Sequence, residues 1–266
     1  MAVNYSLYLD DGGHPADRPQ VIASGFVSTE EKWLAFEPEW VSAVKEIGLG
    51  DVFHMAEFEQ AFRGKPEKWG ILNNLISIVM KHTIGTFISI VDMADYRRVN
   101  EEYPLEECIG KPYAIAARCV AAGINKWKAA EFKKDDRLLV FLEDGTLHRG
   151  DMEEVFKRDA LPVPQPVPKA TPAVQPADLL SWEVGNFYEK DTRRRTLRRI
   201  ISESGVCIEG RYAKKQMLKA LTQYNIPKRD TIAPNVQFVF HSSPKRVRAR
   251  KIGSQRNAET KPLRKP

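Results

Sequence analysis

The stretch from Arg137 to Asp144, RLLVFLED, does most to limit what this chain can fold into. It is almost continuously apolar and then ends on two adjacent acids, Glu143 and Asp144. Such a run is typical of a strand buried on both faces of a sheet, with helices packed above and below it. Further strands are predicted at Val21 to Val27 and, rich in β-branched residues, at Gly85 to Met93.

The first predicted strand ends in an unusual way. Apolar residues alternate with others from Tyr5 to Leu9, which predicts a strand that forms a hairpin with the next one. Asp10, Asp11 and two glycines follow directly. A tight turn needs one acid at most, so the second acid suggests a further role.

Helices are predicted between and after these strands, because apolar residues recur there every three or four positions. Strands with intervening helices indicate an α/β fold with a mixed sheet flanked by helices. The expected helices span residues 30–48, 66–80, 112–127, 148–158, 176–188, 191–203 and 211–224, with a shorter irregular or helical piece at 53–62 and a last strand at 236–240.

Composition excludes several classes of protein. The 266 residues are 42% apolar and include five tryptophans, which indicates a folded core. No run of about eighteen apolar residues predicts a membrane span, and the first ten residues lack the pattern of a signal peptide. Three widely spaced cysteines fit neither a disulfide framework nor a zinc site. We therefore expect a cytoplasmic protein with reduced thiols.

The segment Leu161 to Pro176, LPVPQPVPKATPAVQP, is predicted to be an extended, polyproline-like connection. Its spacing suits a rigid spanning loop, and it also suits docking into an aromatic groove of a protein partner. Along the chain we expect an α/β domain over residues 1–191, a basic helical appendage over 192–242 and a disordered basic tail over 243–266.

Acids stand at three places where they can meet. Asp10 and Glu143 each end a predicted strand, and Asp178 lies in the first turn of a predicted helix. If the two strands are neighbours, their ends bring both acids to one edge of the sheet, and a helix across that edge adds the third. Asp144 is the alternative to Glu143. Each acid alone also fits a plain structural role in a turn or at a helix start.

A cluster of carboxylates is costly unless a cation compensates its charge. Oxygen ligands alone favour Mg²⁺ or Mn²⁺ over a structural zinc ion. Two such ions can hold the attacking water and the leaving oxygen of a phosphodiester in line. The triplet therefore predicts a metal-dependent nuclease.

The strand end YLDDGG and the helix start QPADLL (Gln175 to Leu180) together resemble the bacterial and phage DUF3800 family. That family usually opens with Tyr-Ile-Asp-Glu-Ser-Gly and carries a late Gln-Leu-Ala-Asp-Leu signature. The resemblance covers roughly residues 5–190 and implies a ribonuclease H-like fold with metal-dependent nuclease activity.

By position, the resemblance makes Asp10 the first-strand acid, Asp178 the closing-helix acid and Gly13 the family glycine. Glu143 or Asp144 matches the acid after the later strand. There are two departures from the pattern: Asp11-Gly12 stands in place of Glu-Ser, and Pro176 stands in place of an apolar residue.

The resemblance also covers the segment VFHMAEFE, Val52 to Glu59, which makes His54 and Glu57 candidates to assist catalysis. A single histidine between Phe53 and Met55 also fits a packed side chain. His148 is a second candidate, as a proton shuttle or as a helix cap. Asp92 and Asp95 fit turn chemistry.

Positive charge is concentrated near the C-terminus. Residues 244–266 carry a net charge of +8, whereas the whole chain carries +6, so residues 1–243 carry −2. Basic helices and a basic tail suit phosphate contacts without sequence readout, and they also suit a solvated, solubilising surface. The predicted nucleic-acid-binding residues are Arg193, Arg194, Arg195, Arg198, Arg199, Lys214, Lys215, Lys245, Arg246, Arg248 and Arg250.

Two other functions compete with the nuclease. A phosphatase of the haloacid dehalogenase type also starts with a strand that ends in acid, but it needs Asp-x-Asp, whereas Asp10 and Asp11 are adjacent. A nucleic-acid-binding protein with a ribonuclease H-like fold and no catalysis is the stronger alternative. Metal-dependent cleavage that requires Asp10 would separate it from an enzyme.

Overall fold

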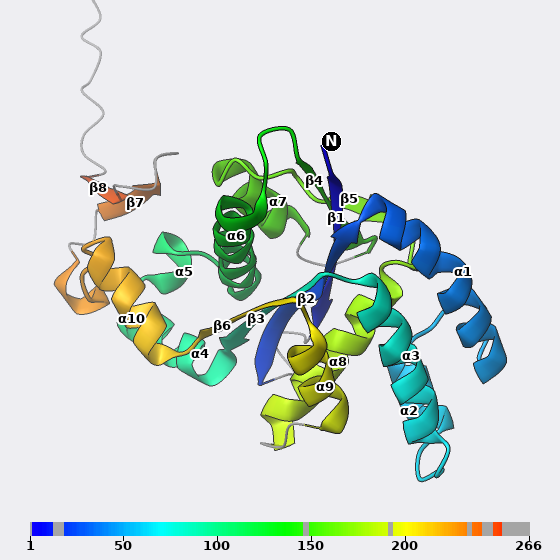
Figure 1. Cartoon of the computed structure of the whole chain (residues 1–266). Helices are drawn as coiled ribbons and strands as arrows, with labels where there is room; N and C mark the ends of the chain where they lie inside the picture. The colour runs from blue at the N-terminus through cyan, green and yellow to red at the C-terminus, as the bar shows by residue number, and fades with distance from the viewer. Residues whose placement is uncertain are drawn as a thin grey trace, which may run out of the picture.

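A six-stranded mixed sheet forms the centre of the protein in the computed structural model, which describes residues 2–12, 19–145, 149–190, 194–232, 236–240 and 247–251 (Figure 1). The strands follow the order β5-β4-β1-β2-β3-β6 along the sheet. Their bounds are β1 (Asn4–Gly12), β2 (Gln20–Thr29), β3 (Gly85–Asp92), β4 (Arg137–Glu143), β5 (Gln165–Val167) and β6 (Val206–Tyr212).

The first three strands form an antiparallel meander, as the predicted hairpin requires. β4 then pairs with β1 in parallel, and β5 pairs with β4 in parallel. β6 extends the opposite edge, parallel to β3. The predicted α/β class with a mixed sheet and flanking helices is thus confirmed.

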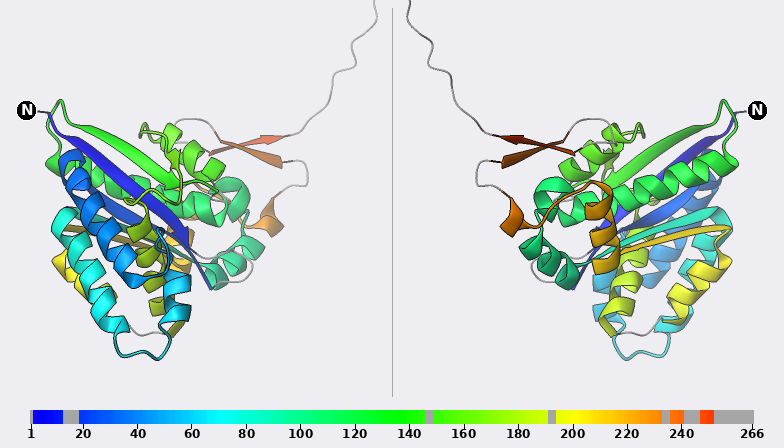
Figure 2. Two further views of the ribbon diagram at one scale, coloured as in Figure 1. Left: turned by 90° about the vertical axis from the view of Figure 1, so that its right-hand side faces the viewer. Right: turned by 90° about the vertical axis from the view of Figure 1, so that its left-hand side faces the viewer.

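Helices cover both faces of the sheet, and each face has its own apolar core. Figure 2 shows the two helical layers from the sides, with α1 and α3 lying next to each other. The first layer contains α1 (Glu30–Ile47), α2 (Met55–Ala61), α3 (Lys68–His82), α8 (Gln175–Lys190) and α9 (Arg195–Glu203). The second contains α4 (Met93–Glu102), α5 (Leu105–Cys108), α6 (Pro112–Glu131), α7 (Arg149–Arg158) and α10 (Lys214–Gln223), and the 3₁₀ turn η1 (Arg229–Thr231) contacts α4.

Alternation along β1 decides which side chains reach which layer. Leu7 and Leu9 are buried in the core beneath α6, whereas Tyr8 packs on the opposite side against Trp33 of α1. Asp10 follows the parity of Tyr8 and therefore faces the layer that contains α8. This alternation places the acid under the helix that carries Asp178.

The prediction that β4 is buried on both faces is wrong. Leu138, Val140 and Leu142 are buried, but Leu139 is 44% exposed and Phe141 is half-buried. The reason is the position of α8, which packs over β1 and β2 and leaves the start of β4 uncovered on that side.

The proline-rich segment contains one short strand. β5 is three residues long and lies at the edge of the sheet, where a proline without an N–H donor is tolerated. The rest of residues 161–174 runs as an extended or turning connection to α8.

The predicted separate helical appendage is not confirmed. Residues 206–212, which were not predicted as a strand, form β6 and join the central sheet. α9 buries Leu197 and Ile200 in one core, and α10 buries Met217 and Leu221 in the other. α9, β6 and α10 are therefore parts of the α/β unit.

The C-terminal region contains β7 (Val236–Phe240) and β8 (Val247–Lys251), which pair with each other in antiparallel orientation. The predicted strand at 236–240 is confirmed. β8 lies within the tail that we predicted to be disordered, so residues 247–251 depart from that prediction. In Figure 1 this two-stranded sheet lies beside α5, apart from the central sheet.

Within the described part of the chain, no helix combines the length and the apolar character that crossing a bilayer would require. Cys108, Cys119 and Cys207 form no disulfide among the described residues.

Candidate functional site

Asp10 lies two residues before the end of β1, and Glu143 ends the neighbouring strand β4. β1 and β4 are in parallel register, with Leu9 opposite Leu142, so the next residue on each strand is one of these acids. The rings of Tyr8 and Phe141 stack on the same side of the sheet at 4.7 Å, two residues before each acid. Asp10 is only 7% exposed and Glu143 is half-buried.

Asp178 comes to the same edge on the first turn of α8. Residues three, four, seven and eight positions later share its face of the helix. Together with the end of β1 and the start of β2, this face lines a pocket of about 180 Å³. The lining residues are Asp10, Asp11, Gly12, Pro19, Gln20, Ile22, Asp178, Ser181, Trp182, Gly185 and Asn186.

Two contacts fix α8 over Asp10. Ser24 lies opposite Asp10 in the β1–β2 register, and its hydroxyl hydrogen-bonds that of Ser181 at 2.8 Å. A side chain at Gly12 would bring its Cβ within 3.2 Å of the Ser181 Cβ. Glycine at position 12 therefore lets the helix approach the strand closely.

Gln175 anchors the start of α8 and was not assigned a role from the sequence. Its side chain is buried and accepts hydrogen bonds from Trp40 Nε1 and from the backbone N–H of Phe53, both at 2.9 Å. One turn later, Asp178 Oδ2 accepts the backbone N–H of Met55 at 2.6 Å. The QPADLL motif thus ties α8 to α1 and to the segment that precedes α2.

His54 lies next to the acids. Its Nδ1 is 3.9 Å from Asp178 Oδ2, and the same nitrogen accepts the backbone N–H of Ala56 at the start of α2. His54 is therefore a helix cap as well as a neighbour of the candidate metal ligand.

The acids influence one another electrostatically. The pKa of Asp10 lies well above its ordinary value, first because the carboxyl is buried and then because Asp178, Asp11 and Glu143 repel its charge. Burial also raises the pKa of Glu143, and Asp178 adds to this effect, whereas Lys169 acts in the opposite direction. Lys169 Nζ lies 3.7 Å from Glu143, and it is a site residue that the sequence analysis did not identify.

Asp11 has a different role from Asp10. Its carboxylate accepts a hydrogen bond from Tyr113 of α6, and together with burial it raises the pKa of that phenol. The doubled acid of YLDDGG thus points one carboxylate toward α8 and ties the other to α6.

Two candidates lie apart from the cluster. Asp144 is exposed in a turn, where its Oδ1 accepts the N–H of Gly145 at 3.0 Å and lies 3.5 Å from Arg149. Glu57 is exposed on α2 and does not line the pocket. Of the two alternatives for the middle acid, the geometry favours Glu143. His148 and Gly13 lie outside the described residues.

Within the described ranges, no three His, Cys, Asp or Glu side chains converge closely enough to form a ready-made metal site. Mg²⁺ does not need such a cage, because it commonly binds one or two carboxylates and keeps several waters. Asp10 and Asp178 supply two carboxylates beside the pocket. The donor chemistry therefore fits a hydrated Mg²⁺ or Mn²⁺.

The predicted basic surface is divided. α9 packs in the core that contains α8, whereas α10, with Lys214 and Lys215, packs in the core on the other face of the sheet. Arg248 and Arg250 belong to β8. Arg193, Lys245 and Arg246 lie outside the described residues.

The arginines of the α9 region also differ from one another. Arg194 is ion-paired with Glu59 at 3.0 Å and with Glu183 at 3.3 Å. Arg199 binds Glu203 and the oxygens of Asn73 and Ser77. Arg195 and Arg198 are exposed.

Asp92 caps α4 by accepting the N–H of Asp95 at 3.0 Å, which agrees with the structural role predicted for this pair. Tyr212 and Tyr224 pack against the core beneath α6.

A scan of known protein families and a search of curated proteins found no match to this chain.

Proposed function

We propose that this protein is a metal-dependent nuclease with a ribonuclease H-like fold, in which Asp10 and Asp178 hold Mg²⁺ or Mn²⁺ and Glu143 lies beside them. The observation that carries the proposal is the buried Asp10 beside a pocket, where three other carboxylates repel its negative charge. Such an arrangement is unfavourable by itself and becomes favourable when a divalent cation is bound.

The topology supports the proposed fold. An antiparallel meander of three strands is extended beside β1 by the parallel strands β4 and β5, and α8 crosses the edge where the acids meet. This brings carboxylates from two strands and one helix to one place, as the resemblance to the DUF3800 family implies.

Each residue has a distinct part in the proposed reaction. A bound divalent ion would polarise the phosphodiester and activate water. Asp10 and Asp178 face the pocket as its ligands, with Glu143 beside them. Because Met55 occupies one oxygen of Asp178, the other oxygen is available to an ion. His54 uses Nδ1 as a cap, so Nε2 is its nitrogen for proton transfer.

The substrate class follows from charge. The acidic pocket needs a ligand that brings phosphate to the metal, and the basic tail supplies a means to gather polyanions. Backbone contacts without base readout are expected, because these charges carry no pattern that distinguishes bases.

The first experiment compares wild type with Asp10→Asn, Asp178→Asn and Glu143→Gln. Each protein is incubated with labelled DNA and RNA in EDTA, Mg²⁺ and Mn²⁺. Asp144→Asn is the matched control, because it removes an exposed acid next to Glu143 without touching the pocket. We expect cleavage only with metal, a loss of about 100-fold or more in the three site variants, and full activity in the control.

A different result would favour the alternative function. If all five proteins bind nucleic acid with strong salt dependence and none cleaves it with either metal, the catalytic proposal fails. The protein is then a non-catalytic nucleic-acid-binding protein. If Asp144→Asn and Glu143→Gln lose cleavage activity equally, the choice of Glu143 over Asp144 is wrong.

A further inference from the structure

A hollow of about 560 Å³ lies between α3 and the start of α9, on the same side of the sheet as the acidic pocket. Its lining combines an aromatic side chain with positive charge. The lining residues are Trp69, Asn73, Arg194, Arg195, Thr196, Arg198 and Arg199. Trp69 is 46% exposed and shares this lining with four arginines.

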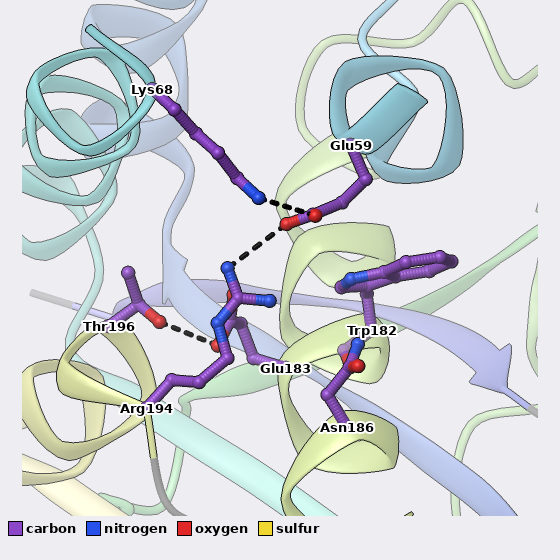
Figure 3. A network of polar contacts seen from close by, with 7 residues as sticks. All are labelled: Glu59, Lys68, Trp182, Glu183, Asn186, Arg194 and Thr196. Atoms are coloured by element: carbon purple, nitrogen blue, oxygen red, sulfur yellow. Dashed lines mark hydrogen bonds and ion pairs between the residues drawn. The ribbon is translucent and has the colours of Figure 1, made fainter. Parts of the chain in front are cut away.

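A polar network that includes two of the lining residues, Arg194 and Thr196, joins the helices around this hollow (Figure 3). Glu183 of α8 has no exposed surface, and it accepts a hydrogen bond from Thr196 while Arg194 lies 3.3 Å away. Arg194 also reaches Glu59, which binds Lys68 as well. The network ties α9 and α3 to the helix that carries Asp178.

Arg194 is therefore a support rather than a free phosphate ligand. Its guanidinium lies 5.1 Å from the centroid of the Trp69 ring, and Lys68 Nζ lies 5.4 Å from the same ring. Two cations, each paired with a carboxylate, therefore lie over an aromatic ring that still exposes nearly half of its surface.

Within the described part of the chain, two arginines without a carboxylate partner line the same hollow as Trp69. Among the residues that the structure describes, Arg195 and Arg198 have no carboxylate partner, and both are exposed. They lie three positions apart on α9, so they project from neighbouring turns of one helix. Arg199 is already bound to Glu203, Asn73 and Ser77.

We propose that this hollow binds an unpaired stretch of nucleic acid, with one base stacked on Trp69 and the flanking phosphates on Arg195 and Arg198. An exposed aromatic ring beside free cations is the combination that single-stranded nucleic acid requires. Bases in a duplex are already stacked and paired, so the geometry favours single strands. The class of ligand rests on the proposed function, whereas the hollow itself does not depend on catalysis.

Binding is measured in EDTA, so that cleavage plays no part. Fluorescence anisotropy with labelled oligothymidylate, oligouridylate and a DNA duplex compares wild type with Trp69→Ala, Trp69→Phe and Arg195→Ala/Arg198→Ala. Leu34→Ala removes another exposed apolar side chain, and Lys126→Ala/Lys134→Ala removes two exposed charges, one on α6 and one in the turn that follows it. Thermal unfolding verifies that each variant is folded.

We expect Trp69→Ala to weaken binding to single strands about tenfold or more, and Trp69→Phe to stay within about threefold of wild type. The double arginine variant should lower the salt slope by about 1.4, at about 0.7 per phosphate contact. Both controls should match wild type. Comparing oligothymidylate with oligouridylate shows whether the protein prefers DNA or RNA.

Unchanged single-strand binding in Trp69→Ala would overturn the inference, and so would an equal loss for duplex and single strands or a wild type that binds neither. These outcomes are separate from the failure of the nuclease. Binding that depends on Trp69 without any cleavage would support the hollow and refute the enzyme. Metal-dependent cleavage together with unchanged binding in Trp69→Ala would support the enzyme and refute the hollow as a binding site.

Discussion

At the scale of single residues, Asp10 lowers the stability of the folded chain, and the proposed chemistry requires it. A buried carboxyl among like charges destabilises the folded chain once it is ionised. The structure provides no compensating cation close to it among the described side chains, since Lys169 and His54 lie nearer to Glu143 and Asp178. This arrangement is expected of a residue kept for metal binding.

We therefore expect Asp10→Asn to raise the free energy of unfolding at pH 7 by roughly 0.5–2 kcal/mol in EDTA, while it abolishes cleavage. The sign follows from the raised pKa of Asp10. As pH rises above about 4, the unfolded chain releases this proton and the folded chain retains it, so wild type loses stability relative to the variant. Thermal unfolding between pH 4 and pH 8 measures the difference.

Mg²⁺ should reverse the order of stability, so that wild type becomes more stable than Asp10→Asn. Mg²⁺ binds the folded wild type and stabilises it, but it should have little effect on Asp10→Asn. Asp144→Asn, which alters an exposed turn acid, should follow wild type at every pH. Parallel curves for wild type and Asp10→Asn across this pH range would contradict the electrostatic account of the site.

At the scale of secondary structure, the sequence predicted most elements that have a strong local pattern. The helix from Glu30 was recognisable because Thr29 caps it and Gly48, with φ of 77°, ends it. The strands β1 to β4 were recognisable from alternation or continuous apolar sequence. Their pairing brought Asp10 and Glu143 together, as the predicted site required.

The elements that were missed depend on distant partners. β6 contains Glu209, Gly210 and Arg211, which weaken a strand pattern, and it exists because β3 offers a parallel edge. α4 follows β3 directly, and only the cap by Asp92 marks its start. The roles of Gln175 and Lys169 depend on contacts with residues far along the chain, so local sequence could not reveal them.

The contact between β1 and β2 yields a prediction at this scale. Gly25 lies opposite Leu9, and a Cβ at this position would be 1.9 Å from the backbone oxygen of Tyr8. Gly25→Ala must push the two strands apart next to Asp10. We expect a loss of roughly 3 kcal/mol or more in stability, measured by urea unfolding, together with loss of cleavage.

Gly70→Ala is the matched control for Gly25→Ala. Gly70 is exposed on α3, and an added Cβ would meet no atom within 4 Å. Alanine is the better helix former, so this variant should gain up to about 1 kcal/mol. A stable, active Gly25→Ala protein would show that the strands tolerate a wider spacing than the structure indicates.

At the scale of the whole molecule, the question is where the folded unit ends. The sequence predicted a boundary near residue 191, because the basic character increases there. In the structure, α9 completes one core, α10 completes the other, and β6 covers the edge of β3. Charge was a poor guide to the boundary, because the basic side chains lie on the outer faces of helices whose inner faces are apolar.

Two truncations test this view. A chain that ends at residue 191 exposes the apolar edge strand β3 and removes Leu197, Ile200 and Met217 from the cores, so it should aggregate or unfold. A chain that ends at residue 232 keeps all three elements and should unfold cooperatively. It also lacks the tail that carries a net charge of +8, so its affinity for nucleic acid should fall and depend less steeply on salt.

The two measurements separate folding from charge. Cooperative unfolding of the shorter chain would restore the predicted boundary at residue 191 and contradict the role of β6. Unchanged salt dependence in the longer chain would mean that the tail contributes little. The hollow beside Trp69 would then be the main contact with the polyanion, because Arg195 and Arg198 are retained in that chain.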